Sequence, residues 1–237
     1  MPATDPVLRV SGLWAGYGGT PILQGLEMAV GKGEIVGVIG RNGVGKTTAM
    51  RCLIGLVRAS AGSIRFNGED VTGRQADGRA RLGMGYVPQG RDVFPRMTVE
   101  ENLLVGELVG GSGGRKLHDL VYQRFPILKE RRRQMAGTLS GGQQQQLAIG
   151  RALVGNPGLM LLDEPSEGVQ PSIVQLICEA LRAIRDELGT TLVFVEQNLD
   201  TILAIGERCY VMEKGRVTSE IPAGRISEES VRGQLLL

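Results

Sequence analysis

The sequence is poor in the residues that build metal clusters and disulfide frameworks. It contains one histidine, His118, and three cysteines, Cys52, Cys178 and Cys209, among 237 residues. The cysteines are odd in number, lie in apolar stretches and show no paired spacing, which favours reduced thiols in the cytosol over disulfides. We expect no metal cluster from these residues, and we expect His118 to be a solvated surface residue.

Long apolar runs and a strong excess of one charge are also absent. No segment approaches the roughly eighteen apolar residues that a membrane-spanning helix needs, and residues 1–10 form neither a basic start nor an apolar signal region. The net charge of +2 is too small to predict nucleic-acid binding, and the short run Arg131–Arg133 is typical of a solvated helix end or a partner surface.

The composition indicates an ordinary globular chain with a real core. Hydrophobic residues make up 42% of the sequence and charged residues 22%, which fits one domain or two closely joined ones. Gly110–Gly114 is the one stretch that resembles a linker, and we expect a mobile loop there.

A glycine-rich segment, Gly40–Thr48, matches the phosphate-loop pattern G-x-x-x-x-G-K-[ST]. It follows Ile35–Ile39, a β-branched run typical of a buried parallel strand, and opens Gly45–Leu56, which we expect to be helical. Backbone N–H groups and a helix N-terminus would then attract phosphates, within reach of Lys46, while the Thr47 hydroxyl is placed for Mg²⁺. A glycine-rich turn without a ligand is the alternative for this segment alone.

A second apolar run, Leu159–Asp163, carries a carboxylate to the end of an expected strand. Ligands bind at the carboxyl ends of strands in open α/β sheets, so Asp163 is a candidate Mg²⁺ ligand beside Thr47. Glu164 follows it directly, in Asp-Glu-Pro. An acidic pair that caps a turn is a credible interpretation of the isolated tripeptide, but the phosphate loop upstream favours a nucleotide site.

Between these segments lies Leu139–Gln145, which reads LSGGQQQ. A phosphate loop followed by LSGGQ and then by LMLLDEP resembles the ATP-binding cassette (ABC) ATPases, and the resemblance covers nearly the whole chain. In that family the LSGGQ signature faces the nucleotide held by a partner's phosphate loop, in a head-to-tail dimer. The resemblance therefore assigns Ser140, Gly141, Gly142 and Gln143 to the partner's ATP. An N-capped helix start is the alternative interpretation, and Ser140 is expected to be such a cap as well.

The resemblance implies roles for further residues. Tyr17 matches the aromatic that stacks on adenine, Gln89 the glutamine that reports Mg²⁺ and γ-phosphate occupancy, and Glu164 the general base that polarises the attacking water. Most cassettes carry a histidine where this chain has Gln197, whose amide hydrogen bonds but cannot titrate near neutral pH.

Together these matches imply ATP and Mg²⁺ as ligands. The implied catalytic residues are Glu164 and Gln197, and the implied Mg²⁺ ligands are Thr47, Gln89 and Asp163. The implied nucleotide-binding residues are Tyr17, Gly40, Arg41, Asn42, Gly43, Val44, Gly45, Lys46, Thr47, Thr48 and Gln89.

The fold class implied by the resemblance is α/β, with a P-loop NTPase (RecA-like) core, an N-terminal antiparallel β subdomain and an inserted α-helical subdomain. We expect residues 1–89 and 158–237 to form the ATP-binding core. Residues 90–157, which include LSGGQ, are expected to form the helical subdomain.

Local patterns predict individual elements within this fold. Strands are expected from about Val7 to Phe66, with Asn67-Gly68 as a turn that closes a small antiparallel sheet. Further strands are expected around Leu192 and Tyr210, and the chain after Lys214 should form a short strand and a small helix. Helices are expected after the capping residue Thr98, over Gln143–Val154 and from Pro171 to Gly189.

Three interpretations of function compete. An importer ATPase fits a single cassette with no fused membrane segment, whereas soluble cassette proteins acting on ribosomes or chromosomes usually show two cassettes or a long coiled coil. A non-transport switch or kinase would lack LSGGQ. The strings Gly85–Pro95, Thr98–Leu103 and Phe194–Asn198 resemble the smaller ATPase subunit of branched-chain amino acid importers. Leu139–Gln146 and Glu167–Ser172 resemble the urea and short-chain amide branch, which is the alternative.

An importer of this kind implies several partners. They are transmembrane permease subunits, a second, non-identical ABC ATPase and, indirectly, a solute-binding protein, with no nucleic acid. The permease's coupling helix is expected to dock at Gly90–Asn102, beside Gln89. The chain would then be a peripheral subunit on the cytoplasmic face of the inner (plasma) membrane, where ATP hydrolysis drives uptake of branched-chain amino acids or related small polar solutes.

Overall fold

The computed structural model describes residues 5–109 and 117–235, so the expected loop Gly110–Gly114 lies outside the described residues. The strands are β1 (Leu8–Tyr17), β2 (Thr20–Val30), β3 (Ile35–Ile39), β4 (Ala59–Phe66), β5 (Glu69–Asp70), β6 (Met84–Val87), β7 (Leu159–Asp163), β8 (Thr191–Glu196), β9 (Arg208–Glu213) and β10 (Arg216–Ile221). The helices are α1 (Lys46–Ile54), α2 (Ala76–Arg81), α3 (Val99–Glu107), α4 (His118–Arg124), α5 (Pro126–Glu130), the 3₁₀ turn η1 (Ala136–Thr138), α6 (Gly141–Leu153), α7 (Pro171–Leu188), α8 (Leu199–Ile205) and α9 (Glu228–Leu235).

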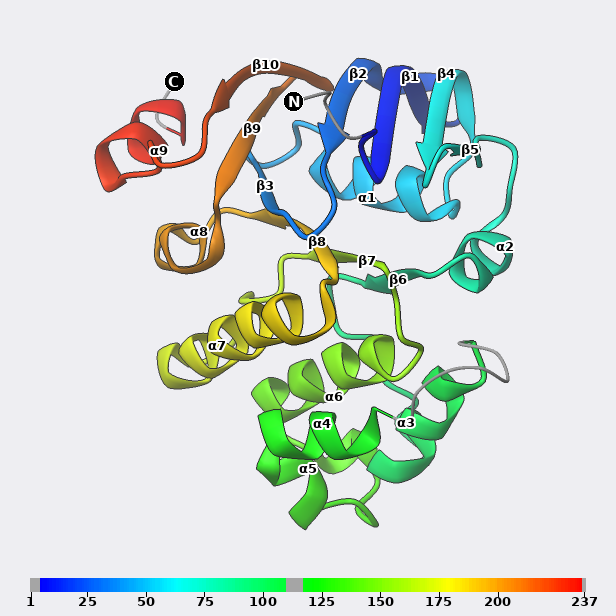
Figure 1. Ribbon diagram of the computed structural model, residues 1–237, viewed down its shortest axis with the longest axis vertical. Helices are drawn as coiled ribbons and strands as arrows, with labels where there is room; N and C mark the ends of the chain where they lie inside the picture. Colours follow the sequence, from blue (N-terminus) through cyan, green and yellow to red (C-terminus); the bar gives the residue numbers. More distant parts are fainter. Residues whose placement is uncertain (1–4, 110–116, 236–237) are drawn as a thin grey trace.

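A six-stranded sheet in the order β10-β9-β3-β8-β7-β6 forms the centre of the molecule (Figure 1). Its strands are parallel from β9 to β6, and β10 pairs antiparallel with β9 at one edge. Every residue of the inner strands β3, β8 and β7 is buried. Burial on both faces explains their uninterrupted apolar runs, and the strands predicted at Ile35–Ile39 and Leu159–Asp163 are confirmed with the same bounds.

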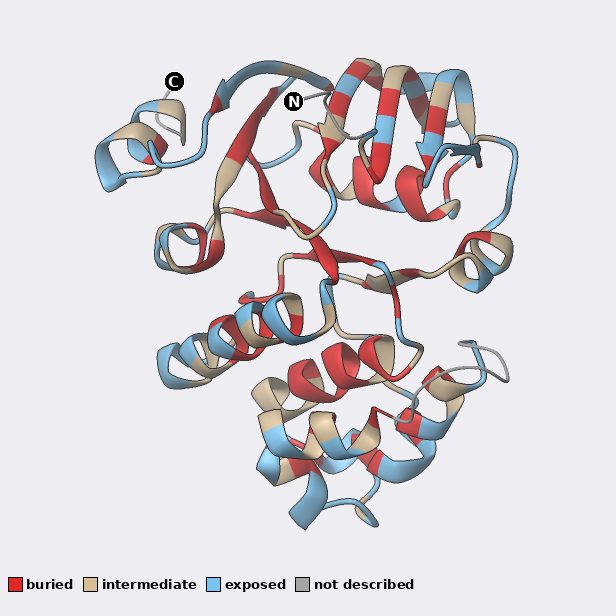
Figure 2. Cartoon of the chain, viewed as in Figure 1, coloured by how far each residue is buried: buried red, intermediate tan, exposed pale blue. Residues whose placement is uncertain are grey.

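Alternate side chains of this sheet contribute to two separate cores. Val36 and Val38 of β3 join a core that includes β1, β2, β4 and α1, whereas Ile35 and Ile39 join one that includes α6 and α7. Figure 1 shows these two sets of elements on opposite sides of the sheet, and Figure 2 shows buried residues on the inner side of α7 and exposed ones on its outer side. The sheet is therefore covered on both faces.

The predicted antiparallel sheet is confirmed as four strands in the order β2-β1-β4-β5. Asn67 and Gly68, between β4 and β5, have φ values of 50° and 81°. A two-residue hairpin turn of this hand requires positive φ at both central residues, and asparagine followed by glycine tolerates it best. The Asn-Gly pair in the sequence therefore predicted this turn correctly.

Helices α3 to α6 gather at the end of the molecule farthest from the antiparallel sheet (Figure 1). Two capping boxes start helices here: Thr98 with Glu101 at α3, and Ser140 with Gln143 at α6. Both caps were predicted, but α6 begins at Gly141 and not at Gln143, because Gln143 occupies the third helical position from which its side chain bonds back to the cap.

Other helix boundaries also follow local signals. Helix α7 has a proline at its first position and ends at Gly189, whose φ of 68° is left-handed, as the sequence predicts. Helix α1 ends at Ile54, two residues before the predicted end at Leu56, because Gly55 adopts a φ of 91°. The short strand and the small helix expected after Lys214 are present as β10 and α9.

The expectation that His118 is a solvated surface residue is wrong. His118 opens α4, its side chain is 19% exposed, and its Nε2 lies 3.1 Å from Oε2 of Glu107 at the end of α3. The contact with Glu107 joins His118 to another helix, and the local sequence does not reveal that contact.

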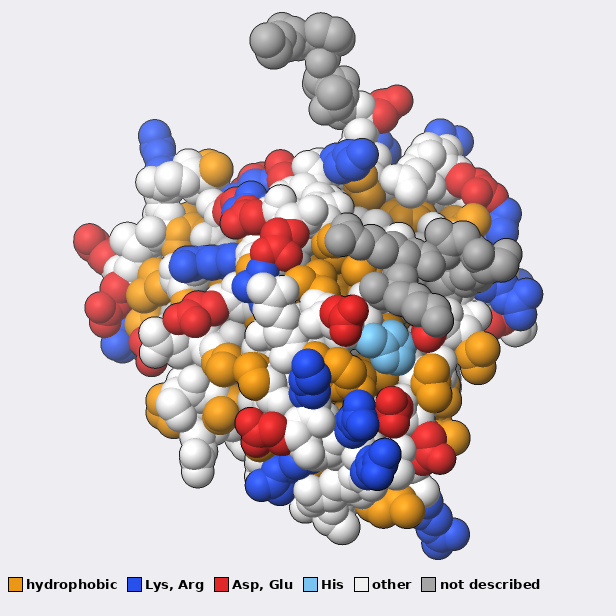
Figure 3. All heavy atoms as spheres, turned by 60° about the horizontal axis from the view of Figure 1, so that its bottom comes forward, with side chains coloured by type: hydrophobic (Ala, Val, Ile, Leu, Met, Phe, Trp, Pro, Cys, Tyr) orange, Lys and Arg blue, Asp and Glu red, His pale blue; other side chains and the backbone are white. Residues whose placement is uncertain are grey.

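The cysteines and the arginine run agree with the expectations from the sequence. Cys52, Cys178 and Cys209 are free and buried. Arg131–Arg133 is exposed after the end of α5. On the face that Figure 3 shows, basic and acidic side chains are interspersed, so the charges there form no extended patch of one sign.

A buried arginine joins α1 to α2. Arg79 is 1% exposed, and its guanidinium donates to four carbonyl oxygens: those of Cys52 at 2.8 Å, Leu53 at 2.7 Å, Arg74 at 3.0 Å and Thr72 at 3.0 Å. The carbonyls at a helix C-terminus have no intrahelical partner, so Arg79 satisfies the end of the helix that follows the phosphate loop.

We expect Arg79→Ala to lower the free energy of unfolding by about 3 kcal/mol, because buried carbonyls would lose charge-assisted hydrogen bonds. Arg81→Ala, an exposed change in the same helix, is the matched control and should stay within about 0.5 kcal/mol of wild type. Urea-induced unfolding of the three proteins measures both effects. Equal stability of the two variants would show that the buried guanidinium contributes nothing.

Candidate active site

Four neighbouring strands of the central sheet deliver the predicted site residues. The strands β3, β8, β7 and β6 are adjacent and parallel, so their carboxyl ends lie along one edge. The phosphate loop follows β3, and Gln197 follows β8. Asp163 ends β7, Glu164 comes directly after it, and Gln89 follows β6. Segments that are far apart in the sequence therefore meet at one edge of the sheet.

The phosphate loop closes around the Lys46 ammonium group. Its Nζ donates to the carbonyl oxygens of Gly40 at 2.8 Å and Arg41 at 2.9 Å, and the lysine is 5% exposed. Gly40 has a φ of 155°, and a Cβ there would lie 2.3 Å from the carbonyl oxygen of Met212. Only glycine fits between this loop and β9, so the sequence pattern has a direct steric cause.

Burial and the neighbouring carboxylates have opposite effects on the pKa of Lys46. Burial lowers its pKa, while the carboxylates of Glu164, Asp163 and Glu196 act in the opposite direction. The ammonium group therefore lies among acidic groups of the neighbouring strands, where it can serve as a fixed positive charge for phosphate oxygens.

Asp163 is fully buried and accepts hydrogen bonds from two hydroxyl groups. Thr47 Oγ1 donates to Oδ1 at 3.1 Å, and the Tyr86 hydroxyl donates to Oδ2 at 3.2 Å. Burial raises the pKa of Asp163, and the two hydrogen bonds partly offset that rise. A carboxylate and a hydroxyl side by side offer the hard oxygen ligands that Mg²⁺ takes, so these residues fit the predicted metal.

Glu164 contacts amide groups from the loops that follow two other strands, β8 and β6. Gln197 Nε2 donates to Oε1 at 2.7 Å, and Gln89 Nε2 lies 3.3 Å from Oε2. Gln89 also donates to Glu167 Oε2 at 3.0 Å. The structure thus brings the predicted residues Gln89, Glu164 and Gln197 together, with Gln89 directed at the two glutamates.

Tyr17 lies at the edge of a cavity of about 460 Å³ that Arg51 and Tyr86 also line. Tyr17 is 47% exposed, so solvent reaches this residue. Arg51 lines the same cavity as the two tyrosines, and the Tyr86 hydroxyl donates to Asp163 Oδ2 at 3.2 Å. Tyr17 therefore shares this cavity with Tyr86, whose hydroxyl contacts the buried carboxylate.

The remaining phosphate-loop residues divide by exposure. Arg41, Asn42 and Gly43 are exposed, whereas Gly45 and Thr48 are buried and Val44 packs against the core. We call the exposed residues 41–43 the crest of the loop, and solvent reaches them.

The structure does not bring the LSGGQ residues to the phosphate loop of the same chain. Helix α6, which Ser140 caps, lies in the helical end of the molecule, away from α1 (Figure 1). The Arg91 guanidinium covers Gly141, where a Cβ would lie 2.6 Å from Nη1, and it donates to the carbonyl oxygen of Gly168 at 3.2 Å. Within this chain, the signature therefore contacts the loops after β6 and β7.

Two residues of the site were missed in the sequence. Tyr86 hydrogen bonds to Asp163, and Glu196 is a buried carboxylate at the end of β8. A charged residue that ends an apolar run, as Glu196 does in Thr191–Glu196, is the signal that could have indicated the second one. Tyr86 gave no comparable signal, because its role depends on β6 pairing with β7.

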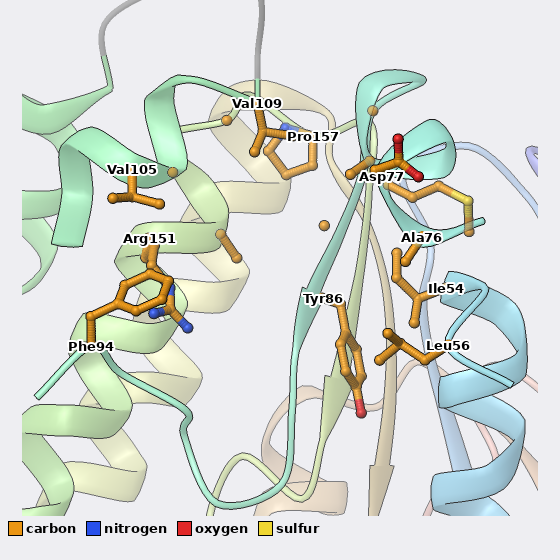
Figure 4. A pocket seen from close by; sticks show the side chains of 17 residues that line it. Ile54, Leu56, Ala76, Asp77, Tyr86, Phe94, Val105, Val109, Arg151 and Pro157 are labelled. Atoms are coloured by element: carbon orange, nitrogen blue, oxygen red, sulfur yellow. The ribbon is translucent and has the colours of Figure 1, made fainter.

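An apolar cavity of about 380 Å³ adjoins the site (Figure 4). Phe94, Val105 and Arg151 line one side and Ile54 and Leu56 the other, with Tyr86 between them in the view. The Arg151 guanidinium carbon lies 4.8 Å from the centre of the Phe94 ring, and Phe94 is 43% exposed. The cavity is therefore bordered by the segment Gly90–Asn102 that was expected to receive a partner.

No helix within residues 5–109 and 117–235 is both long and apolar enough to cross a membrane.

Comparison with known proteins shows the family of the chain. The family description "ABC transporter" matches residues 23–167. The chain is 46% identical to the high-affinity branched-chain amino acid transport ATP-binding protein BraG of Pseudomonas aeruginosa, over 85% of this chain and 86% of that protein. It is 34% identical to the probable branched-chain amino acid transport ATP-binding protein LivF of Archaeoglobus fulgidus, over 94% of each.

A solved structure supports the same family assignment, that of the ABC transporters. The ADP conformation of an ATP-binding cassette of an ABC transporter superposes with a TM-score of 0.77 and 31% identity, covering 97% of this chain and 94% of that one. The α/β fold with a phosphate loop is thus the fold of these cassettes. The chain belongs to the ABC transporter family, as one of its ATP-binding subunits that hydrolyse ATP.

Proposed function

We propose that this ATPase drives an importer for branched-chain amino acids. The observation that carries the proposal is the 46% identity to a branched-chain amino acid transport ATP-binding protein over 85% of the chain. Urea or a short-chain amide is the alternative solute, which the relatives named above do not favour. No residue of an ATPase subunit needs to touch the solute, so the solute must be tested in cells.

The contacts within the site support the following division of roles. Lys46 binds the β- and γ-phosphates, Thr47 and Asp163 hold Mg²⁺ with Gln89 nearby, and Glu164 acts as general base. When bound, Mg²⁺ neutralises charge on the phosphate oxygens. Tyr17 stacks on adenine, and the crest of the phosphate loop and Thr48 contribute the remaining nucleotide contacts.

We further propose that the chain works in a larger assembly. Residues 1–89 and 158–237 are the ATP-binding core and 90–157 the helical subdomain, whose Ser140 to Gln143 act on ATP held by a second, non-identical ATPase. The separation of α6 from α1 supports that role (Figure 1). Permease subunits dock at the cavity beside Phe94, on the cytoplasmic face of the inner membrane, and a solute-binding protein supplies the cargo.

Glu164→Gln should lower kcat for ATP hydrolysis at least about a hundredfold, because the amide cannot take a proton from water. ATP binding should persist, since the change keeps the shape of the side chain. Phosphate release and nucleotide affinity are measured on the purified chain, with the exposed Glu179→Gln on α7 as the matched control. Normal turnover by the Glu164 variant would remove its assignment as the base.

Gln197→Ala should lower kcat roughly tenfold without adding a pH dependence, because the amide orients Glu164 and carries no titrating proton. Gln197→His should instead lose activity as the pH falls below the imidazole pKa of about 6.5 or somewhat higher, because the imidazolium would pair with Glu164. Rates from pH 5.5 to 8.5 test both expectations. Unchanged turnover in Gln197→Ala would contradict the role.

Uptake of labelled leucine and labelled urea identifies the solute. In cells that lack this gene, we expect leucine uptake to be lost, to return with the wild-type gene and to remain lost with Glu164→Gln. Loss of urea uptake with normal leucine uptake would assign the alternative solute. If neither uptake changed, the proposed importer function for these two solutes would be wrong.

A further inference from the structure

A second buried carboxylate lies behind the site and has no role in the scheme above. Glu196 is the last residue of β8 and is 3% exposed. An unpaired carboxylate is costly to bury unless hydrogen-bond donors surround it. Both of its oxygens are in fact bonded, and each oxygen serves a different loop.

The first oxygen holds the loop that follows the proposed base. Oε1 accepts hydrogen bonds from the Ser166 N–H at 2.9 Å and from Ser166 Oγ at 2.6 Å. Ser166 comes two residues after Glu164 and is 7% exposed. The position of this loop, and of the backbone that carries Glu164, is thereby tied to β8.

The second oxygen holds the loop that carries Gln197. Oε2 accepts from the backbone N–H of Gln197 at 3.0 Å and of Asn198 at 3.2 Å. The side chains of Gln197 and Glu164 meet at 2.7 Å, so the two loops that Glu196 joins are those that carry this pair.

The hydrogen bonds around Glu196 also affect its pKa. Burial raises the pKa of Glu196, and the hydrogen bonds from Ser166, Asn198 and Gln197 act against that rise. Three of its four donors are backbone N–H groups, which cannot turn away when the acceptor is lost. Replacing an acceptor oxygen by a donor would leave the buried N–H groups that face it unsatisfied, and their loop would shift to find other partners.

We propose that Glu196 is a positioning residue for ATP hydrolysis: its carboxylate joins the loops after β7 and β8 and so sets the contact between Gln197 and Glu164. The proposal rests on the roles proposed above for Glu164 and Gln197. Glu196 itself lies behind the reacting groups and acts through them.

The first test is Glu196→Gln in the purified full chain. The amide presents one oxygen and one N–H₂ group, so one loop would face a donor in place of an acceptor. We expect kcat to fall roughly tenfold to a hundredfold, because a small displacement of catalytic groups has an effect of that size. The KM for ATP should stay within about twofold, since the phosphate loop is unchanged.

Glu207→Gln is the matched control. Glu207 also accepts a backbone N–H, that of Ile35 at 3.1 Å, but at the opposite end of β3 from the phosphate loop. Loss of this acceptor should affect stability and leave kcat unchanged. Melting temperatures of both variants separate a catalytic effect from general loosening of the fold.

A double-mutant cycle distinguishes positioning from structural support. If Glu196 acts through Gln197, then Glu196→Gln should reduce kcat much less in the Gln197→Ala background than in wild type. Ser166→Ala removes one of the four donors and keeps the fold, so a loss of a fewfold in kcat is expected. This milder variant provides the test if Glu196→Gln does not fold.

The outcomes separate the two proposals. Wild-type kcat in Glu196→Gln, or in Ser166→Ala if the first variant does not fold, would overturn the positioning role, as would additive effects in the cycle. If Glu164→Gln and Gln197→Ala also hydrolyse ATP at the wild-type rate, the proposed function of that pair fails first. A loss of kcat only in the two catalytic variants would leave their roles intact and reject Glu196 alone.

Discussion

The order of four parallel strands is the constraint on which the site depends. Because β3, β8, β7 and β6 are neighbours, the hydrogen-bond ladder places Ile39 opposite Glu196 and Asp163 opposite Val195. Residues as distant in sequence as Gln89 and Glu164 can then share a hydrogen bond. Each loop contributes one or two polar groups, and the rigid sheet fixes their separation.

Two buried carboxylates on adjacent strands meet the cost of burial in different ways. Asp163 accepts from two side-chain hydroxyls, those of Thr47 and Tyr86, which can rotate or move when a cation arrives. Glu196 accepts from three backbone N–H groups and one hydroxyl, so its acceptor capacity is used by the protein itself. A buried carboxylate can therefore serve as a ligand in one strand, as we propose for Asp163, and connect two loops in the next strand, as Glu196 does.

Patterns that depend on near neighbours in the chain were predictable, and contacts set by strand order were not. The phosphate loop, the cap at Ser140 and the turn at Asn67-Gly68 follow from backbone sterics and local hydrogen bonds, and the structure contains all three elements. The hydrogen bonds of Glu196 and Tyr86 require knowing which strands pair. The error at His118 has a similar origin, since its partner Glu107 belongs to another helix.

The backbone of Glu164 shows how far its geometry depends on β8. Its φ of 48° is left-handed, which costs a non-glycine residue about 1–2 kcal/mol, so the surrounding contacts must outweigh that strain. The Glu164 N–H donates to the carbonyl oxygen of Val195 at 3.0 Å, and two residues later Ser166 is bound to Glu196. Both contacts come from β8. Although Glu164 directly follows β7, the neighbouring strand holds its strained turn and so directs the carboxylate toward Gln197. Any movement of β8 relative to β7 would therefore be transmitted directly to this pair.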